Sequence, residues 1–295
     1  MAMLSTPCLL LIDAMALAYR SFHAIPPLTA ADGTPTNAIF GFVKALRHLR
    51  ERFQPTHQAV VFDGGLPPKR LALLSDYKAQ REPMPADLAR QLPLLDEYLD
   101  AARISRIRLD DEEADDVLAT LASKAEVAGM QVRMATNDKD LFQVVSASVA
   151  LVSPVKDAVV MGPMEVEAKT GVKPEQIPDW LALVGDSADN IPGVPGVGPK
   201  TAARLLVQFG SWSNIWASLA SIPGEKTRSA LHASKFLIER NQSMVTLDLE
   251  VAGVPDLESL RVAMPDAQQL HAFFHRLNMP SLAPVVPAPT QQELF

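Results

Sequence analysis

Acidic side chains gather in five stretches of this 295-residue sequence, and they are the residues whose types and spacing best suit chemistry. Two stretches hold a single aspartate each, and the others read DDEEADD (110–116), TNDKD (136–140) and GDSADN (185–190). The candidate ligands in them are Asp13, Asp63, Glu113, Asp115, Asp116, Asp138, Asp140, Asp186 and Asp189. Carboxylates held close together repel one another strongly, so cations must neutralise them if the fold brings them into one cleft.

The ligand chemistry restricts the kind of cation. No cluster of histidine or cysteine accompanies these acids in the sequence, and sites built from oxygen ligands alone select hard ions such as Mg²⁺ or Mn²⁺. Nine carboxylates exceed what one ion can use, so we expect two or more ions per chain. Two such ions about 4 Å apart cleave phosphodiesters in many enzymes. The acids therefore indicate metal-dependent phosphodiester hydrolysis.

Each acid taken singly also has an ordinary structural explanation. An aspartate at the end of a strand is usually a turn former or a helix cap. Glu113 and Asp116 are three residues apart at the start of a predicted helix, where the helix dipole favours carboxylates and the two side chains share a face. These alternatives stay open for the single residues, and only their convergence favours a metal site.

An alternation of apolar runs and helical patterns would position the acids. Predicted strands and helices in the first half are Cys8–Ile12, Ala14–Phe22, Thr36–Phe53, Gln58–Phe62, Asp115–Ala128 and Gln131–Ala135. Strands that alternate with helices pair in parallel and form an α/β sheet covered on both faces. Ligands bind outside the carboxyl ends of such strands, and all three predicted strands run out into an aspartate of the set.

A basic, proline-rich stretch at 66–93 interrupts this alternation. Its Tyr77, Lys78 and Arg81 suit a site where a ring stacks on a base and cations hold the phosphate. Arg70 is a further candidate DNA contact, and Arg20 could point into the same cleft. Solvated surface charge is the alternative for each residue, and an exposed connection is the alternative to a mobile cover over a site.

Residues 191–203 read IPGVPGVGPKTAA, which predicts a tight hairpin ahead of an amphipathic helix. Glycines let backbone N–H groups approach a phosphate, and the helix N-terminus adds positive charge. The pattern favours a helix–hairpin–helix that grips a nucleic-acid backbone without reading its sequence, although a plain turn is the alternative. The predicted DNA contacts here are Gly193, Val194, Gly196, Val197, Gly198, Lys200 and Thr201.

The organisation expected from these patterns has three parts. They are an α/β core (1–174) with the basic stretch, a helical DNA-binding region (175–280) with the hairpin at 185–210, and a Pro-rich tether with a tail (281–295). Predicted helices of the second part are Pro174–Val184, Thr201–Phe209, Thr227–Arg240 and Asp266–Leu277. The final QQELF is typical of bacterial sliding-clamp ligands, which would bind through Gln291, Leu294 and Phe295. A frayed tail that packs on the body is the alternative.

Composition agrees with a globular protein of the reducing cytoplasm. Hydrophobic residues make up 48% and charged residues 21%, which excludes a mostly disordered chain. The single cysteine, Cys8, excludes an intrachain disulfide, and no apolar run is long enough to span a bilayer. The net charge of −7 argues against a nucleic-acid binder by the usual expectation. Here, however, many of the acids belong to the predicted metal site.

The order of the motifs resembles the 5′ nuclease family, which contains flap endonucleases and the 5′–3′ exonuclease domain of bacterial DNA polymerase I. The resemblance covers roughly residues 5–280. The pieces that carry it are Asp13, Tyr19-Arg20, VVFD (60–63), YKAQR (77–81), EADD (113–116), TNDKD (136–140) and GDSADNIPGVPGVGPKTA (185–202).

The resemblance implies a Rossmann-like (PIN/resolvase-like), mainly parallel sheet with a helical arch at 66–93, followed by a helix–three-turn–helix. It implies one metal cluster on the residues Asp13, Asp63, Glu113, Asp115 and Asp116, and a second on Asp138, Asp140, Asp186 and Asp189. Lys78, Arg81 and Arg20 would assist at the scissile phosphate, and the hairpin would hold K⁺.

The activity implied is 5′–3′ exonuclease and flap endonuclease cleavage of DNA with 5′ ends, flaps or nicks, and of RNA–DNA primers, in primer removal and repair. We expect a stand-alone, cytoplasmic and nucleoid-associated enzyme. Two other functions stay open from the residues. One is a non-catalytic, structure-specific DNA-binding module that uses the hairpin, and the other is a PIN-like RNase that shares the α/β core.

Overall fold

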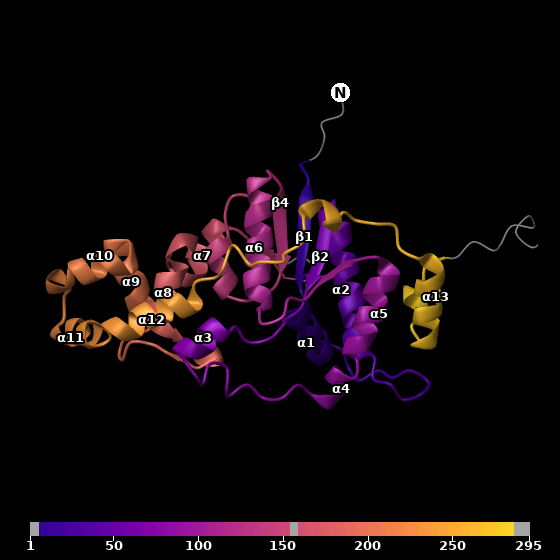
Figure 1. Ribbon diagram of the computed structural model, residues 1–295, viewed down its shortest axis with the longest axis horizontal. Coiled ribbons are helices and arrows are strands. Elements are labelled where there is room, and N and C mark those ends of the chain that lie inside the picture. Colours follow the sequence, from indigo (N-terminus) through magenta and orange to yellow (C-terminus); the bar gives the residue numbers. More distant parts are fainter. Residues whose placement is uncertain (1–5, 154–158, 286–295) are drawn as a thin grey trace, which may run out of the picture.

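A six-stranded sheet lies at the centre of the computed structural model, which describes residues 6–153 and 159–285 (Figure 1). The strand order is β3-β2-β1-β4-β5-β6, and all neighbours pair in parallel except β5 and β6. The strands are β1 (Cys8–Asp13), β2 (His57–Val61), β3 (Ser105–Ile107), β4 (Gln131–Ala135), β5 (Val149–Val152) and β6 (Val160–Met161). The predicted α/β class with a mainly parallel sheet is therefore confirmed.

The apolar run of β1 explains why the sheet is covered on both faces. Leu9 and Leu11 face a core cluster that includes α6 (Ala114–Val127), whereas Leu10 and Ile12 face a second cluster on the opposite side. Side chains alternate along a strand, so a continuous apolar run fills two cores. Helices on the second face are α1 (Ala14–Ala24), α2 (Asn37–Phe53), α5 (Leu92–Ala102) and α13 (Ala267–Arg276).

Helix α13 packs on the sheet domain and not on the helical region, where the sequence pattern had placed it. Phe273 and Phe274 contact Tyr98 of α5, and all three side chains are buried. Figure 1 shows α13 at one end of the elongated molecule and α9–α11 at the other. Residues 246–266 connect the two ends, and Val262 donates its N–H to the carbonyl of Thr56 on the way. The position of α13 is therefore fixed by contacts between residues that are distant in sequence.

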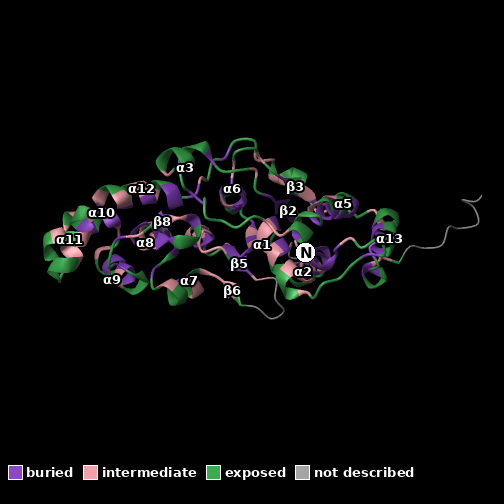
Figure 2. Cartoon of the chain, turned by 90° about the horizontal axis from the view of Figure 1, so that it is seen from below, coloured by how far each residue is buried: buried purple, intermediate pink, exposed green. Residues whose placement is uncertain are grey.

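The helical region shares the first core cluster with α6, so buried residues continue from the sheet into it (Figure 2). Its helices are α7 (Pro163–Thr170), α8 (Ile177–Val184), α9 (Pro199–Phe209), α10 (Trp212–Ala217), α11 (Glu225–Ala233) and α12 (Lys235–Val245). The single helix predicted at Thr227–Arg240 is wrong. The chain turns at Ser234, and the separate helices α11 and α12 bury Leu231 and Ile238 in the same core.

Short elements complete the described chain. They are α3 (Pro68–Leu73), α4 (Ala86–Ala89), β7 (Gly185–Asp186), β8 (Ile191–Pro192), and the 3₁₀ turns η1 (Asp140–Val144), η2 (Pro174–Gln176), η3 (Ser187–Asp189), η4 (Leu219–Ser221), η5 (Leu257–Leu260) and η6 (Pro280–Leu282). The basic stretch, which we call the arch segment (66–93), thus contains two short helices, α3 and α4, and ends in the first turn of α5. Its far end is fixed by Gln91, which is buried and accepts the N–H of Ala38 over 2.8 Å.

The extended linker predicted from residue 281 is wrong at its start. Residues Pro280–Leu282 form η6, Leu282 is 7% exposed, and Arg47 donates to its carbonyl. The predicted clamp-binding residues Gln291, Leu294 and Phe295 lie outside the described residues. Among the helices that the structure describes, none combines the length and the hydropathy needed to cross a membrane.

Candidate functional site

The carboxyl ends of the central strands open onto a cavity of about 490 Å³. Four of the nine predicted ligands line it, namely Asp13, Asp63, Asp115 and Asp138. Asp13 ends β1, Asp63 follows β2, and Asp138 follows β4, as parallel pairing of these strands requires. The cavity therefore lies where the sequence predicted the acids to meet.

Asp13 and Asp63 also cap helices, which is the ordinary structural explanation for an aspartate at the end of a strand. Asp13 accepts the N–H of Ala16 over 2.9 Å and caps α1. Asp63 accepts the N–H of Ala114 over 3.1 Å at the start of α6. Each cap uses a single lone pair of one carboxylate oxygen, Oδ1, so lone pairs remain on both oxygens for other partners. Capping thus orients these side chains at the cavity and does not compete with a role there.

Thr136 is a site residue that sequence reasoning missed. Its hydroxyl donates to Oδ2 of Asp13 over 3.0 Å and accepts the N–H of Asp138 over 3.1 Å. The signal for it was available: Ala135 pairs with Ile12 in the sheet, so the next residue along β4 lies beside Asp13.

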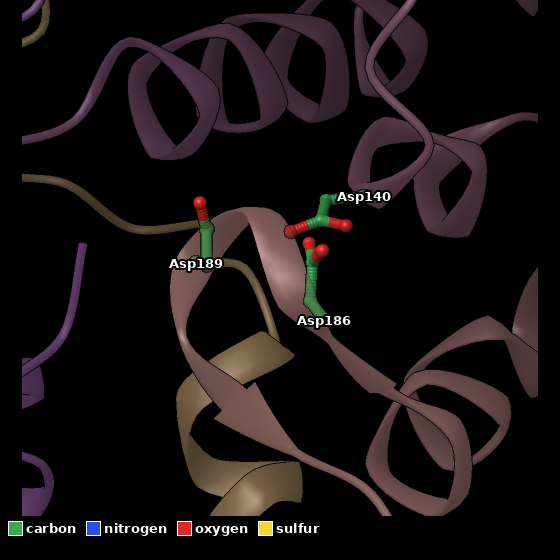
Figure 3. Close-up of side chains that lie close together, drawn as sticks. All are labelled: Asp140, Asp186 and Asp189. Atoms are coloured by element: carbon green, nitrogen blue, oxygen red, sulfur yellow. The ribbon is translucent and has the colours of Figure 1, made fainter. Parts of the chain in front are cut away.

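A second acidic group adjoins the cavity. Carboxylate oxygens of Asp140, Asp186 and Asp189 all lie within 4.8 Å of one another, and Figure 3 shows those of Asp140 and Asp186 directed at each other. Asp140 begins η1, and the other two belong to the loop around η3. The Nζ of Lys139 lies 2.8 Å from Asp186, and an Nη of Arg81 lies 2.7 Å from Asp189. This triad can hold a metal ion.

The last two predicted ligands do not line the cavity. Glu113 and Asp116 share a face of α6, as expected, but this face lies against α3, and both carboxylates pair with Arg70. Glu113 also pairs with Lys78. Seven of the nine acids therefore lie in the cavity or the triad, and two lie against the base of the arch segment.

Electrostatics distinguish the acids that protein cations neutralise from those that they do not. Among the described residues, no lysine or arginine pairs with Asp13, Asp63, Asp115, Asp138 or Asp140. Burial, helped by the charge of Asp63, raises the pKa of Asp13 to about 6. Burial and the neighbouring carboxylates also raise the pKa of Asp115 and of Asp140. Such a destabilising cluster is typical of a site that another charged species neutralises.

The donor set fits a hard divalent cation. All the ligand candidates are carboxylates, which such ions prefer. Oδ1 of Asp140 is buried and has no hydrogen-bond partner among the described residues, so this oxygen is available to a cation.

Residues of the arch segment lie closer to the acids than the sequence indicated. Tyr77 is 4% exposed, and its hydroxyl lies 3.2 Å from oxygens of Glu113 and Asp189. The expectation that its ring is free to stack on a base is therefore wrong for this conformation. Lys78 is also buried, whereas the side chain of Arg81 is half exposed; both line the cavity.

Three further contacts tie the arch segment to the loop around η3. The side-chain amide of Gln80 donates to the carbonyl of Ser187, and that of Asn190 donates to the carbonyl of Asp76 over 2.9 Å. Asn190 has a positive φ of 62°, which asparagine tolerates. The backbone N–H of Lys78 also donates to the carbonyl of Asp189 over 3.1 Å. No local pattern predicts these pairings, because they join segments more than 100 residues apart.

Arg20 does not line the acidic cavity. It lies with Lys44 and His48 in a groove of about 390 Å³ between α1 and α2. Residues 16 and 19 of α1 face the cavity, and position 20 is turned by about 100° from position 19. The expectation that Arg20 points into the same cleft is therefore wrong for this conformation.

The hairpin between α8 and α9 is held by a close crossing of two glycines. A Cβ on Gly193 would lie 2.0 Å from the carbonyl oxygen of Val184, and one on Gly185 would lie 2.3 Å from the N of Gly193. Val194 and Val197 are buried, so their side chains belong to the core and are not a DNA surface, contrary to the prediction.

The exposed part of this hairpin consists mostly of backbone groups and the side chain of Lys200. Gly196, Gly198 and Lys200 are exposed, and Thr201 is half-buried in the first turn of α9. The helix begins at Pro199, whose carbonyl accepts the indole N–H of Trp180 over 3.2 Å. These residues present N–H groups, a helix N-terminus and an ammonium group on one turn.

Fold and site together define a two-part protein: a resolvase-like α/β domain with a carboxylate cluster, followed by a helical domain. The model of the 5′-3′ exonuclease N-terminal resolvase-like domain matches residues 8–171, and that of the 5′-3′ exonuclease C-terminal SAM fold matches residues 172–268. A 5′-3′ exonuclease of Aquifex aeolicus is 39% identical over 274 residues, with 93% of each chain covered. The chain belongs to the 5′-3′ exonuclease family, which confirms the resemblance.

Other relatives are longer. DNA polymerase I of Bacillus subtilis is 38% identical over 93% of this chain, and a thermostable DNA polymerase I of Thermus thermophilus is 41% identical over 92%. The chain spans about a third of each of these polymerases, 32% of their length.

Solved structures share the fold. A T5 5′-exonuclease with bound divalent metal ions (zinc) has a TM-score of 0.68 at 22% identity, over 94% of this chain and all of that one. The catalytic core of Rad2 in complex with DNA substrate has a TM-score of 0.61 at 17% identity, over 92% of this chain and 88% of that one.

Proposed function

We propose that this chain is a metal-dependent 5′–3′ exonuclease and 5′ flap endonuclease that hydrolyses phosphodiester bonds in DNA and in RNA–DNA primers. The observation that carries the proposal is the acidic cavity at the carboxyl edge of the sheet, whose carboxylates pair with no lysine or arginine of the described residues. Membership of the 5′-3′ exonuclease family supports the reaction class.

The cavity and the triad would hold two or more Mg²⁺ or Mn²⁺ ions. Their ligands would be Asp13, Asp63, Asp115 and Asp138 in the cavity and Asp140, Asp186 and Asp189 in the triad. When bound, such ions supply Lewis-acid activation of the phosphodiester and of the attacking water. The T5 5′-exonuclease, which shares this fold and was solved with bound divalent metal ions, supports this assignment.

Lys78 and Arg81 are placed to bind the phosphate that reaches the cavity. Burial lowers the pKa of Lys78, but the Glu113 and Asp189 carboxylates raise it more, so the net pKa lies above its ordinary value and the ammonium stays charged. A fixed cation in a desolvated site stabilises negative charge that develops on the phosphoryl oxygens. These two side chains therefore act by charge and position, and no side chain needs to be a nucleophile.

The hairpin would hold the duplex by its backbone. The exposed glycines, the N-terminus of α9 and Lys200 suit phosphate oxygens, so we expect binding that is independent of sequence. We extend the proposal to a K⁺ ion held by the hairpin carbonyls. DNA with 5′ ends, flaps or nicks is the proposed substrate, and the Rad2 core solved with DNA substrate supports DNA binding.

The proposed cellular role is primer removal and repair at the nucleoid, and the tail would bind a sliding clamp through Gln291, Leu294 and Phe295. Deletion of residues 291–295 should weaken clamp binding without changing cleavage of a free flap. Unchanged clamp affinity in the deletion would remove this part of the proposal.

A 5′-labelled flap incubated with the enzyme in Mg²⁺ or in EDTA tests the function. We expect cleavage in Mg²⁺, none in EDTA, and a loss of about 10² or more in kcat for Asp13→Asn. Asp100→Asn, at an exposed carboxylate on α5, is the matched control and should cleave normally. Flap binding without cleavage in Mg²⁺ would favour the non-catalytic DNA-binding module, and preferential cleavage of RNA would favour the RNase.

A further inference from the structure

A buried ion pair lies at the base of the arch segment. The Nη1 and Nη2 atoms of Arg70 bond Oδ2 and Oδ1 of Asp116 over 2.6 and 3.0 Å. Arg70 is 3% exposed and Asp116 is fully buried. This is the bidentate geometry in which a guanidinium binds a carboxylate most strongly.

The pair joins three segments that are distant in sequence. Oδ1 of Asp116 also accepts the N–H of Asp248 over 2.8 Å, and Nε of Arg70 donates to the carbonyl of Met244 over 2.9 Å. Arg70 belongs to α3, Asp116 to the first turn of α6, and Met244 to the last turn of α12. The base of the arch segment is thereby fixed both to the sheet domain and to the helical region.

Asp115 and Asp116 are neighbours with opposite surroundings. Asp115 lines the acidic cavity and has no lysine or arginine partner among the described residues. Asp116 is turned by about 100° around α6, does not line the cavity, and uses both oxygens for donors of the protein itself. Three donors occupy its oxygens, two of them from the guanidinium of Arg70, which already neutralises its charge. Among the described residues, Asp13 accepts only from the neutral groups of Ala16 and Thr136, so Asp116 has less capacity left for a metal ion than Asp13.

We propose that Arg70 and Asp116 are a positioning pair that fixes the base of the arch segment, instead of the DNA contact that the basic stretch suggests for Arg70 and the metal ligand that the family resemblance implies for Asp116. Both groups are buried, so loss of Arg70 leaves the Asp116 charge without a countercharge, and loss of Asp116 leaves Glu113 as the carboxylate partner of Arg70.

The pair reaches the reaction through Lys78. Arg70 also pairs with Glu113, and Glu113 pairs with Lys78, which lines the cavity. When Asp116 holds Arg70 in place, Glu113 stays oriented toward Lys78. The effect of the pair on Lys78 rests on the proposed function, whereas the fixing of the arch segment by Arg70 and Asp116 does not.

Calorimetric titration with Mn²⁺ in the absence of DNA distinguishes a metal ligand from a residue that only fixes the arch segment. We expect Asp115→Asn to lower Mn²⁺ affinity at least about tenfold, and Asp116→Asn to leave Mn²⁺ stoichiometry and affinity unchanged. Limited trypsin digestion should in turn cut the arch segment faster in Asp116→Asn than in Asp115→Asn, at Lys78 and Arg81.

Arg70→Lys is the second variant, because it keeps the charge and loses the bidentate geometry. It should show the same faster arch digestion and a lower kcat with an unchanged KM. The salt dependence of flap binding should keep its slope in Arg70→Lys and Arg70→Gln, whereas removal of a phosphate contact, as in Lys200→Gln, should reduce the slope by about 1.

The proposal is overturned if Asp116→Asn loses Mn²⁺ as Asp115→Asn does, or if Arg70→Gln reduces the salt slope as Lys200→Gln does. If Asp116→Asn fails to fold, the rate at which trypsin digests the arch segment of Arg70→Lys decides the question. Digestion of Arg70→Lys at the wild-type rate would count against the proposed pair. A wild-type protein that binds no Mn²⁺ would contradict the proposed function, while the digestion rates would still test the pair.

Discussion

Thr136 and Asp13 are hydrogen-bonded across the ends of two paired strands, although 123 residues separate them in the sequence. The hydroxyl donates to Oδ2 of Asp13, and the same oxygen of Thr136 accepts the N–H of Asp138. One buried side chain thereby orients two of the cavity carboxylates.

Replacement of Thr136 by valine keeps the shape and removes the hydroxyl. The hydrogen bond from Thr136 lowers the pKa of Asp13, so Thr136→Val should raise that pKa further and shift the acidic limb of the kcat/KM profile to higher pH. The free energy of unfolding should fall by about 1–3 kcal/mol, because a backbone N–H loses its partner. Thr136→Ser keeps the hydroxyl and should restore both values; an unshifted pH profile in the valine variant would count against this role.

Without divalent ions, the folded protein should lose stability as the pH rises from about 4 to about 6. Asp13 has its pKa raised to about 6 from 3.8, so in this interval the folded chain binds more protons than the unfolded chain. The free energy of unfolding therefore decreases with pH, by up to about 3 kcal/mol for this group. The raised pKa values of Asp115, Asp138 and Asp140 act in the same direction.

Urea unfolding in EDTA at several pH values measures this loss. Asp13→Asn should flatten the decline, and Mg²⁺ should abolish it in the wild type because a cation replaces the missing protons. A wild-type stability that is level or rises between pH 5 and pH 6 in EDTA would show that these carboxylates do not repel one another as described.

The crossing of Gly185 and Gly193 should make the hairpin intolerant of a side chain. Gly193→Ala places a Cβ 2.0 Å from the carbonyl oxygen of Val184, so the backbone must move and stability should fall by more than about 2 kcal/mol. Gly198 has open space around it and a φ of −91°, so Gly198→Ala should cost less than about 1 kcal/mol. Thermal melting compares the two variants, and equal losses would be the contrary result.

Two buried glutamines provide a matched test of polar burial. Gln58 is 1% exposed, and neither polar atom of its side chain has a partner among the described residues. Gln58→Met should therefore raise the free energy of unfolding by about 1 kcal/mol or more. Gln91 is equally buried but bonds Ala38 and Asn37, so Gln91→Met should lower it; a loss of stability in both variants would contradict this account of Gln58.

Local pattern was sufficient for the strands that build the site. The apolar runs of β1, β2 and β4 and the aspartates that follow them predicted the acidic edge of the sheet. The sequence did not indicate β3, which has only three residues, or the break at Ser234 between α11 and α12. A helical period continues through such a break, because the same core face is buried before and after it.

The direction in which each acidic side chain points could not be predicted from the sequence. Spacing placed Glu113 and Asp116 on one face of α6, but only tertiary packing decides that this face meets Arg70 while Asp115 meets the cavity. The same holds for Arg20, whose place between α1 and α2 depends on the rotation of α1 against the sheet. Long-range packing also buries Tyr77 against the acids.

Anomalous diffraction from crystals soaked in Mn²⁺ tests most directly whether divalent ions make this acidic edge stable. The account predicts ordered Mn²⁺ at the cavity of Asp13 and Asp115 and at the triad of Asp140, Asp186 and Asp189, with Asp116 still paired to Arg70. Saturating Mn²⁺ that leaves both places without an anomalous peak would contradict it.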